Sequence, residues 1–239
     1  MRHAGFRMSL FTRSTRMNKV IDIKAAVDKI KAGDRLMVGG FGNIGAPMNL
    51  LYELGTRPEI NHLTTISEDF HSSGKEWQSF NPMLLNGQVD EIIVSFFGHK
   101  WAQEKMDKGE VKLTLVPQGT LAERIRAAGA GLGGFYTPTG VGTIAAEGKE
   151  VREINGRKYV LEMPLSADVA IVKAWKADRM GNAIFNYTAQ NFNTAMATAA
   201  TTVILECEVL VEPGEIRPDE VQLPGVFVYY VVHCPMARF

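Results

Sequence analysis

The sequence has little of what marks a secreted, membrane-spanning or nucleic-acid-binding protein. Its two cysteines, Cys207 and Cys234, are too few for a disulfide framework and lack the spacing of a zinc site, so we expect a reducing compartment and no bound metal. The longest apolar runs, such as residues 226–232, are far shorter than the roughly 20 residues that span a bilayer. The 26 basic and 26 acidic residues cancel, so no net charge steers the chain to nucleic acid. These absences predict a soluble globular protein with neither a membrane nor a nucleic-acid partner.

The one local excess of positive charge lies at the N-terminus. Residues 1–16 contain four arginines and no acid, which leaves 22 basic against 26 acidic residues in the rest of the chain. Such a composition is typical of a mitochondrial presequence, or of a leader translated from an upstream start with Met17 as the functional first residue. We therefore expect residues 1–16 to be disordered, residues 17–232 to form one domain and residues 233–239 to be a tail. The protein should be cytoplasmic, or mitochondrial if the leader is a real presequence.

Short apolar runs alternate with helical periodicity along most of the chain. Strands are predicted at residues 35–38, 63–66, 92–96, 113–116, 169–172, 202–205 and 226–232, and helices at 23–30, at 48–54 and beyond 120. Because parallel strands need crossover connections, this alternation predicts an α/β fold with an open, mostly parallel, doubly wound sheet. The dipeptide Asn155-Gly156 between two short strand-like runs predicts a hairpin, and so a small antiparallel insertion.

A glycine-rich segment directly follows the first predicted strand. Residues 39–47 read Gly-Gly-Phe-Gly-Asn-Ile-Gly-Ala-Pro and precede a predicted helix. Glycines there let the backbone approach a ligand, while amide N–H groups and the helix N-terminus can face a phosphate or an oxyanion. The spacing fits neither the Walker loop nor the dinucleotide fingerprint, and purely structural glycine turns are common at strand ends. Both interpretations, ligand binding and a structural turn, are open at this point.

Two further polar segments follow predicted strands. Gln118 comes where open α/β sheets bind ligands, although it could simply cap a loop while Glu123 and Arg126 form a solvated pair. Glu68 and Asp69 follow another strand. A buried carboxylate at that place could act as a base or a nucleophile, whereas two adjacent acids in a loop are commonly just exposed.

Five blocks of sequence, in order, carry a resemblance to a known family. They are residues 39–47, 116–126, 129–138, 174–178 and 189–193. Together they resemble the A, or alpha, subunit of a family I coenzyme A transferase of the 3-oxoacid or acetoacetate/butyrate type, over roughly residues 17–232. The glycine loop alone would be weak support, but five ordered blocks argue strongly against a chance match.

The resemblance implies an enzyme that moves CoA from an acyl-CoA to a short-chain carboxylate or 3-oxoacid. Coenzyme A is then a substrate, and no cofactor is bound permanently. The family also implies a B, or beta, subunit, expected in an α2β2 assembly, whose Ser-Glu-Asn-Gly motif supplies a nucleophilic glutamate; this chain has no such motif. That glutamate passes through an acyl-glutamyl anhydride and a glutamyl-CoA thioester, which divides a difficult exchange into easier steps.

Carried over by position, the resemblance implies roles for three parts of this chain. Gln118 would lie beside the partner's glutamate and orient the substrate. Related A subunits present a Ser-Asn or Asn-Asn pair where this chain has Ser67-Glu68, so an amide is replaced by a potential anion that could tune acid specificity. The residues implied to bind CoA are Gly39, Gly40, Phe41, Gly42, Asn43, Ile44 and Gly45.

Two other functions are alternatives to the transferase. In a CoA-thioester hydrolase or a C–C bond-cleaving relative, Glu68 would activate water or attack the thioester itself, and no acceptor acid would be needed. The second alternative is a binding protein without catalytic activity. A neighbouring reading frame with Ser-Glu-Asn-Gly would favour the transferase over both.

Overall fold

The computed structural model describes residues 18–71, 80–98 and 100–235. The expected leader lies outside these residues. The strands are β1 (Arg35–Val38), β2 (Leu63–Ile66), β3 (Asp69–His71), β4 (Val89–Val94), β5 (Phe96–Gly98), β6 (Lys112–Leu115), β7 (Phe135–Thr137), β8 (Val151–Ile154), β9 (Arg157–Glu162), β10 (Ala167–Asp178), β11 (Ala183–Ile184), β12 (Ala200–Val211) and β13 (Tyr230–His233). The helices are α2 (Ile23–Val27), α3 (Met48–Gly55), α4 (Asn81–Leu85), α5 (Lys100–Asp107), α6 (Gln118–Gly129) and α7 (Asn193–Ala199), with 3-10 turns η1 (Ile144–Ala146), η2 (Tyr187–Gln190) and η3 (Gly225–Phe227).

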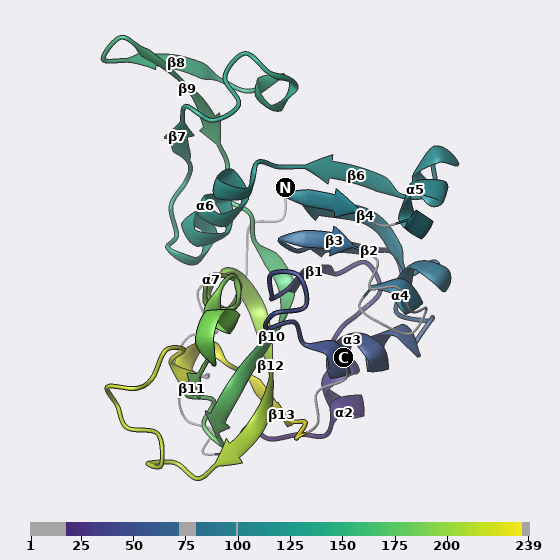
Figure 1. Ribbon diagram of the computed structural model, residues 1–239, viewed down its shortest axis with the longest axis vertical. Helices are drawn as coiled ribbons and strands as arrows, with labels where there is room; N and C mark the ends of the chain where they lie inside the picture. The colour runs from purple at the N-terminus through teal and green to yellow at the C-terminus, as the bar shows by residue number, and fades with distance from the viewer. Residues whose placement is uncertain (1–17, 72–79, 99, 236–239) are drawn as a thin grey trace.

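A parallel sheet runs through the body of the molecule (Figure 1). Its strand order is β13-β12-β10-β1-β2-β4-β6, with every neighbouring pair parallel, and the short β11 adds to β10 in the antiparallel direction. The chain begins at the centre with β1, moves outward to β6, and then returns to the other side of β1 with β10. The predicted open α/β fold is confirmed, and the strand order reverses between β1 and β10.

Apolar side chains pack on both faces of this sheet. On β1, Leu36 and Val38 belong to the core under α2, α3 and α4, whereas Met37 belongs to the core under α6 and α7. Figure 1 shows these two groups of helices on opposite sides of the sheet. Because successive side chains of a strand point to opposite faces, one short apolar run supplies both cores. No helix among the described residues is long and apolar enough to cross a membrane.

The predicted antiparallel insertion is a three-stranded sheet that projects from the body (Figure 1). Strands β8 and β9 form the expected hairpin, and Asn155 and Gly156 at its tip have φ values of 52° and 76°, as a tight hairpin turn requires. The base of the insertion is fixed to α6, because the Arg124 side chain donates a hydrogen bond to the Met163 carbonyl oxygen. The buried Glu162 beside it pairs with Lys149 at 2.6 Å.

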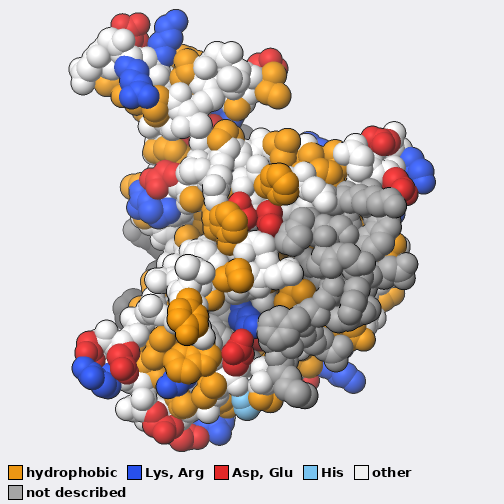
Figure 2. Space-filling view, in the orientation of Figure 1, with side chains coloured by type: hydrophobic (Ala, Val, Ile, Leu, Met, Phe, Trp, Pro, Cys, Tyr) orange, Lys and Arg blue, Asp and Glu red, His pale blue; other side chains and the backbone are white. Residues whose placement is uncertain are grey.

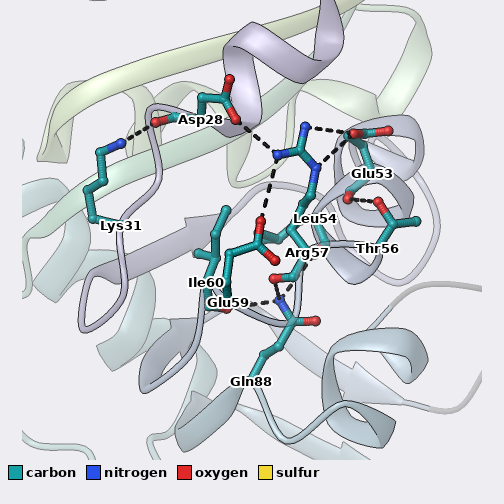
Figure 3. Close-up of polar contacts among 9 residues, drawn as sticks. All are labelled: Asp28, Lys31, Glu53, Leu54, Thr56, Arg57, Glu59, Ile60 and Gln88. Atoms are coloured by element: carbon teal, nitrogen blue, oxygen red, sulfur yellow. Dashed lines mark hydrogen bonds and ion pairs between the residues drawn. The ribbon is translucent and has the colours of Figure 1, made fainter.

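A polar cluster fixes the turn between α3 and β2 (Figure 3). The buried Gln88 side chain donates to the carbonyl oxygens of Leu54, Arg57 and Ile60 at 2.9–3.1 Å. The Arg57 guanidinium contacts Glu53 on α3 and Asp28 just after α2. Gln88 therefore joins the end of α3 to the turn that leads into β2, and Arg57 joins that turn to α2.

Strands β10 and β12 extend far beyond the predicted residues 169–172 and 202–205. Each has twelve residues, and the two are paired from Ala167–Ala200 to Asp178–Val211. The apolar run of β10 stops before Lys173 and that of β12 stops before Glu206, and the predicted strands therefore end there. The strands continue because each provides the other with backbone hydrogen bonds.

Other predicted limits are shifted as well. The predicted strand at 92–96 is divided, because β4 ends at Val94 and β5 begins at Phe96. Of residues 226–232, only the last part is strand, because η3 precedes β13. Strand β13 ends at His233, one residue beyond the predicted strand. Helix α2 is shorter than the predicted 23–30. Helix α6 begins at Gln118 instead of beyond residue 120, because Pro117 supplies an N-terminal boundary that needs no amide.

The first described residues pair with the last strand. The Ile21 amide donates to the Val231 carbonyl oxygen, and the Val231 amide donates to the Lys19 carbonyl oxygen, both at 2.9 Å. The Lys19 ammonium also donates to the Gly225 carbonyl oxygen at 2.7 Å. Residues 19–21 therefore cover the outer edge of the sheet at β13.

Candidate active site

The glycine loop, residues 39–45, leaves the carboxyl end of β1 where the strand order reverses. The last residue of β1, Val38, is in register with Ile171 of β10, and the Gly39 amide still donates to the Ile171 carbonyl oxygen at 2.9 Å. Beyond that point β1 has ended but β10 continues. In open α/β sheets, ligands bind at this kind of switch point.

The tip of the glycine loop is a tight turn. Phe41 and Ile44 exchange two backbone hydrogen bonds of 3.0 and 3.1 Å, which places Gly42 and Asn43 at the tip. The amides of Gly40, Gly42 and Asn43 donate to no described residue. Such unpaired N–H groups can stabilise an oxyanion or a carbonyl oxygen that gains charge.

A narrow pocket lies between the glycine loop and Glu68. Gly39, Gly40 and Gly42 line one side of it, and Glu68, which follows the neighbouring strand β2, lines the other. Its volume of about 10 Å³ is enough for about one water molecule. Glu68 is only 4% exposed, and the Ser95 hydroxyl donates to its carboxylate at 2.9 Å. The interpretation of Glu68 as a merely exposed loop residue is therefore wrong.

An open apolar groove lies on the other side of the loop. Its volume is about 340 Å³, and it is lined by Phe41 from the loop, Ala122 from α6, and Asn191, Phe192 and Ala195 at or beside α7. Gln118 is one helical turn before Ala122, so the two residues share a face of α6. The Gln118 side chain is exposed and makes no hydrogen bond to the described residues.

Gln118 does not line the pocket that contains Glu68. The glycine loop therefore lies between the narrow pocket, which contains the Glu68 carboxylate, and the apolar groove, which is near the Gln118 side-chain amide. The solvated pair expected further along α6 is present, because the Arg126 guanidinium contacts Glu123 at 2.6 Å. The hydrogen bond from Arg126 lowers the pKa of the Glu123 carboxyl.

Two glycines of the loop are required by packing. An added Cβ at Gly39 would lie 1.9 Å from the Asn193 Oδ1 atom, and one at Gly45 would lie 2.6 Å from the Ala189 carbonyl oxygen. Neither distance is possible in a folded protein. The structural interpretation of the glycines is correct for these two positions, although Gly39 also lines the pocket beside Glu68.

The N-terminus of α3, which follows the loop, is occupied by the chain itself. The Glu206 carboxylate, 1% exposed, accepts hydrogen bonds from the amides of Asn49 and Leu50 at 3.1 and 3.0 Å, and from the Asn49 side chain at 2.9 Å. The expectation that this helix end faces a ligand is therefore wrong. A ligand at the loop would therefore meet the amides of the loop and not the Asn49 and Leu50 amides of α3.

Sequence reasoning missed the roles of Asn193 and Glu206. Asn193 belongs to a block that carried the family resemblance, so a signal for it existed, but nothing local tells what its side chain contacts. Glu206 interrupts an apolar run, and a charged residue there predicts the end of a buried strand. Within the described ranges, no group of three or more His, Cys, Asp or Glu side chains is placed to hold a metal ion.

Residues 20–234 match the family described as Coenzyme A transferase. The A subunit of the probable succinyl-CoA:3-ketoacid coenzyme A transferase of Bacillus subtilis is 47% identical over 218 residues, which are 90% of each chain. The A subunit of the 3-oxoadipate CoA-transferase of Pseudomonas putida is 44% identical over 220 residues, 90% of this chain and 94% of the relative.

A solved structure supports the same fold. The acyl-CoA transferase YdiF from E. coli O157:H7, determined as a thioester complex with CoA, has a TM-score of 0.82 at 21% identity. The match covers 92% of this chain but 48% of that one, so this chain spans about half the length of YdiF. The chain belongs to the coenzyme A transferase family. It is a CoA-transferase of the A, or alpha, type.

Proposed function

We propose that this chain is one half of a two-subunit enzyme that moves CoA from an acyl-CoA to a short-chain carboxylate or a 3-oxoacid. The observation that carries the proposal is the glycine loop at the β1–β10 switch point, which lies beside the buried Glu68 carboxylate and whose Gly40 and Gly42 amides donate to no described residue. The relatives named above act on succinyl-CoA with a 3-ketoacid or on 3-oxoadipate, which supports carboxylic acids of this class as substrates. CoA is a substrate, and no cofactor is bound permanently.

The nucleophile comes from the partner. This chain lacks Ser-Glu-Asn-Gly, so a glutamate supplied by the B subunit is the group that attacks the thioester carbonyl and expels the CoA thiolate, which leaves an acyl-glutamyl anhydride. The thiolate then attacks the glutamyl carbonyl and releases the first carboxylate, which gives glutamyl-CoA. The acceptor acid reverses these two steps and leaves as the new acyl-CoA. In each step the loop amides and Gln118 orient an oxygen that gains negative charge.

Assembly and location complete the proposal. The enzyme forms an α2β2 tetramer in the cytoplasm, or in mitochondria if residues 1–16 are a presequence, and residues 17–232 act as one domain. The charges support the absence of a nucleic-acid partner, because Figure 2 shows acidic and basic side chains interspersed on the face in view.

The pocket beside Glu68 favours a second candidate, a CoA-thioester hydrolase. A buried carboxylate next to space for one water molecule is the arrangement that general-base hydrolysis needs. In that case Glu68 would remove a proton from water as it attacks the thioester carbonyl, and free CoA and a free acid would leave. The two candidates differ in whether an acceptor acid is required.

Reconstitution with the neighbouring gene product tests the proposal. We expect the copurified complex to transfer CoA from succinyl-CoA or another acyl-CoA to a panel of acids, and the chain alone to be slower by about 1000-fold or more, because it lacks the nucleophile. Borohydride should trap glutamyl-CoA on the partner. Full transfer by the chain alone would refute the proposal. Release of CoA without an acceptor, abolished in Glu68→Asn, would establish the hydrolase.

Gln118→Ala should lower kcat/KM of the complex by about 10-fold or more, the usual scale for removal of one oriented polar group. Gln118 is exposed and unpaired within the described residues, so its loss should leave the thermal unfolding midpoint unchanged. Steady-state kinetics with varied acyl-CoA measure the effect. The matched control is Glu123→Ala on the same helix, which breaks a surface ion pair and should retain full activity. Equal kinetics for both variants would remove Gln118 from the site.

A further inference from the structure

The buried amide of Asn193 links the glycine loop to the second half of the sheet. Asn193 is the first residue of α7 and is fully buried. We propose that it is a positioning residue for CoA transfer, which holds the tip amides of the loop in place without touching the substrate. The catalytic part of this inference rests on the proposed function, whereas the structural part does not.

Three hydrogen bonds of Asn193 join three separate segments. Its Oδ1 atom accepts from the Lys173 amide of β10 at 3.0 Å, and its Nδ2 atom donates to the carbonyl oxygens of Gly45 at 3.0 Å and Ala189 at 2.8 Å. Because β1 ends at Val38 while β10 continues, the Lys173 amide faces a place that none of the described strands fills. Asn193 satisfies that amide and uses its other end to hold the loop.

The loop and Asn193 are shaped for each other. Gly39 at the start of the loop has no room for a Cβ because Oδ1 of Asn193 would be 1.9 Å away, and a Cβ at Gly45 would lie 2.9 Å from Nδ2. Asn193 is thus enclosed between the two ends of the loop. A shift of its side chain by even half an ångström would move one of those ends, because buried polar contacts of this kind have few alternatives.

A second contact holds the loop beside its tip. The Asn191 side chain donates to the Ile44 carbonyl oxygen at 2.9 Å. Asn191 and Asn193 therefore bind the carbonyl oxygens of the C-terminal limb of the loop. The amides of Gly40, Gly42 and Asn43, which donate to none of the described residues, are left to face a ligand. This division explains how a turn rich in glycine can still present its amides in one fixed arrangement, which transition-state stabilisation requires.

Two measurements on Asn193→Ala and Asn193→Asp test the inference. In the full chain, hydrogen exchange of the Phe41 and Ile44 amides, which are bonded to each other's carbonyl oxygens, should be faster by about 10-fold or more, because the loop opens locally. In the complex with the partner, kcat should fall by about 10-fold or more with a smaller change in KM for acyl-CoA. The aspartate matches asparagine in shape, but it places a carboxylate oxygen against the Gly45 and Ala189 carbonyl oxygens, so it should not rescue the function.

Asn182→Ala is the matched control. Asn182 also joins two segments, because it donates to Asp178 at 2.8 Å and accepts from the Gly225 amide at 2.9 Å, but it is not in contact with the loop. This variant should lose stability to a similar degree while loop exchange and kcat stay normal. A kcat loss equal to that of Asn193→Ala would mean that general destabilisation explains both, which would overturn the inference.

A double variant separates packing from positioning. Gly39→Ala alone should unfold at a lower temperature, whereas Gly39→Ala with Asn193→Ala should regain stability, since the nearest remaining atom is a Val172 methyl carbon at an acceptable 3.4 Å. The double variant should still show fast loop exchange and low kcat. Wild-type exchange or wild-type kcat in Asn193→Ala would overturn the inference. A wild-type complex without transferase activity would instead refute the proposed function and leave the exchange result standing.

Discussion

Glu206→Ala should lower the free energy of unfolding by about 3 kcal/mol, since it leaves buried donors of α3 without an acceptor. The donors are the Asn49 and Leu50 amides and the Asn49 side chain, all bound to one carboxylate that is 1% exposed. Urea-induced unfolding measures the loss. Glu206→Gln is the matched control, because its amide oxygen can still accept from both backbone amides, and we expect it to stay within about 1 kcal/mol of the wild type. An alanine variant as stable as the wild type would show that water replaces the carboxylate.

The same residue gives the stability a pH dependence of defined sign. Burial raises the pKa of the Glu206 carboxyl above its ordinary value of 4.5, although hydrogen bonds from Asn49 and Leu50 and the charge of Lys173 act in the opposite direction. The folded state therefore binds this proton more tightly than the unfolded state. The resulting stability is complete below pH 4.5 and is lost as the pH rises through the raised pKa. The wild type should thus gain stability relative to Glu206→Gln as the pH falls through that range.

Gly40→Val should reduce kcat/KM for acyl-CoA by about 100-fold or more, the scale of a misplaced catalytic loop. Gly40 has a φ of +118°, which L side chains rarely adopt, and an added Cβ would lie 3.0 Å from the Ala46 amide nitrogen and Cα. The valine must therefore displace the loop, including the glycines that line the pocket beside Glu68. Kinetics of the reconstituted complex and CoA affinity by calorimetry measure the effect.

Gly33→Val controls for backbone strain in that experiment. Gly33 has a φ of +84°, but no atom of the described residues lies within 4 Å of an added Cβ, and Gly33 lies in the turn before β1. Both variants should lose about 1–3 kcal/mol of stability from strain, but only Gly40→Val should lose CoA affinity. Normal affinity in a folded Gly40→Val protein would show that the loop does not approach CoA.

Local pattern was enough to predict much of the sheet. The strand limits at residues 35–38 and 63–66 are confirmed, as is the hairpin at Asn155-Gly156, because an apolar run or a turn dipeptide is information carried by neighbouring residues. The long β10 and β12 could not be predicted in full. Their second halves contain charged residues, such as the Lys173–Glu208 pair at 2.9 Å, that become acceptable only once the two strands lie side by side.

The candidate site was predictable in its position but not in its construction. Glycines after β1 and an acid after β2 must meet when those strands are neighbours, and the structure brings the loop and Glu68 together. The contacts of Asn193 and Glu206 join residues that are about 150 positions apart. A buried polar side chain has no sequence period, so only the tertiary structure identifies its partners.

The pairing of residues 19–21 with β13 sets an order of events during synthesis. Lys19 leaves the ribosome early, yet its ammonium group binds a carbonyl oxygen that is 206 residues further along the chain. Until β13 emerges, the growing chain keeps an uncovered sheet edge, which is the kind of surface that aggregates. A nonsense codon ahead of β13 should therefore yield an insoluble product rather than a weakened enzyme.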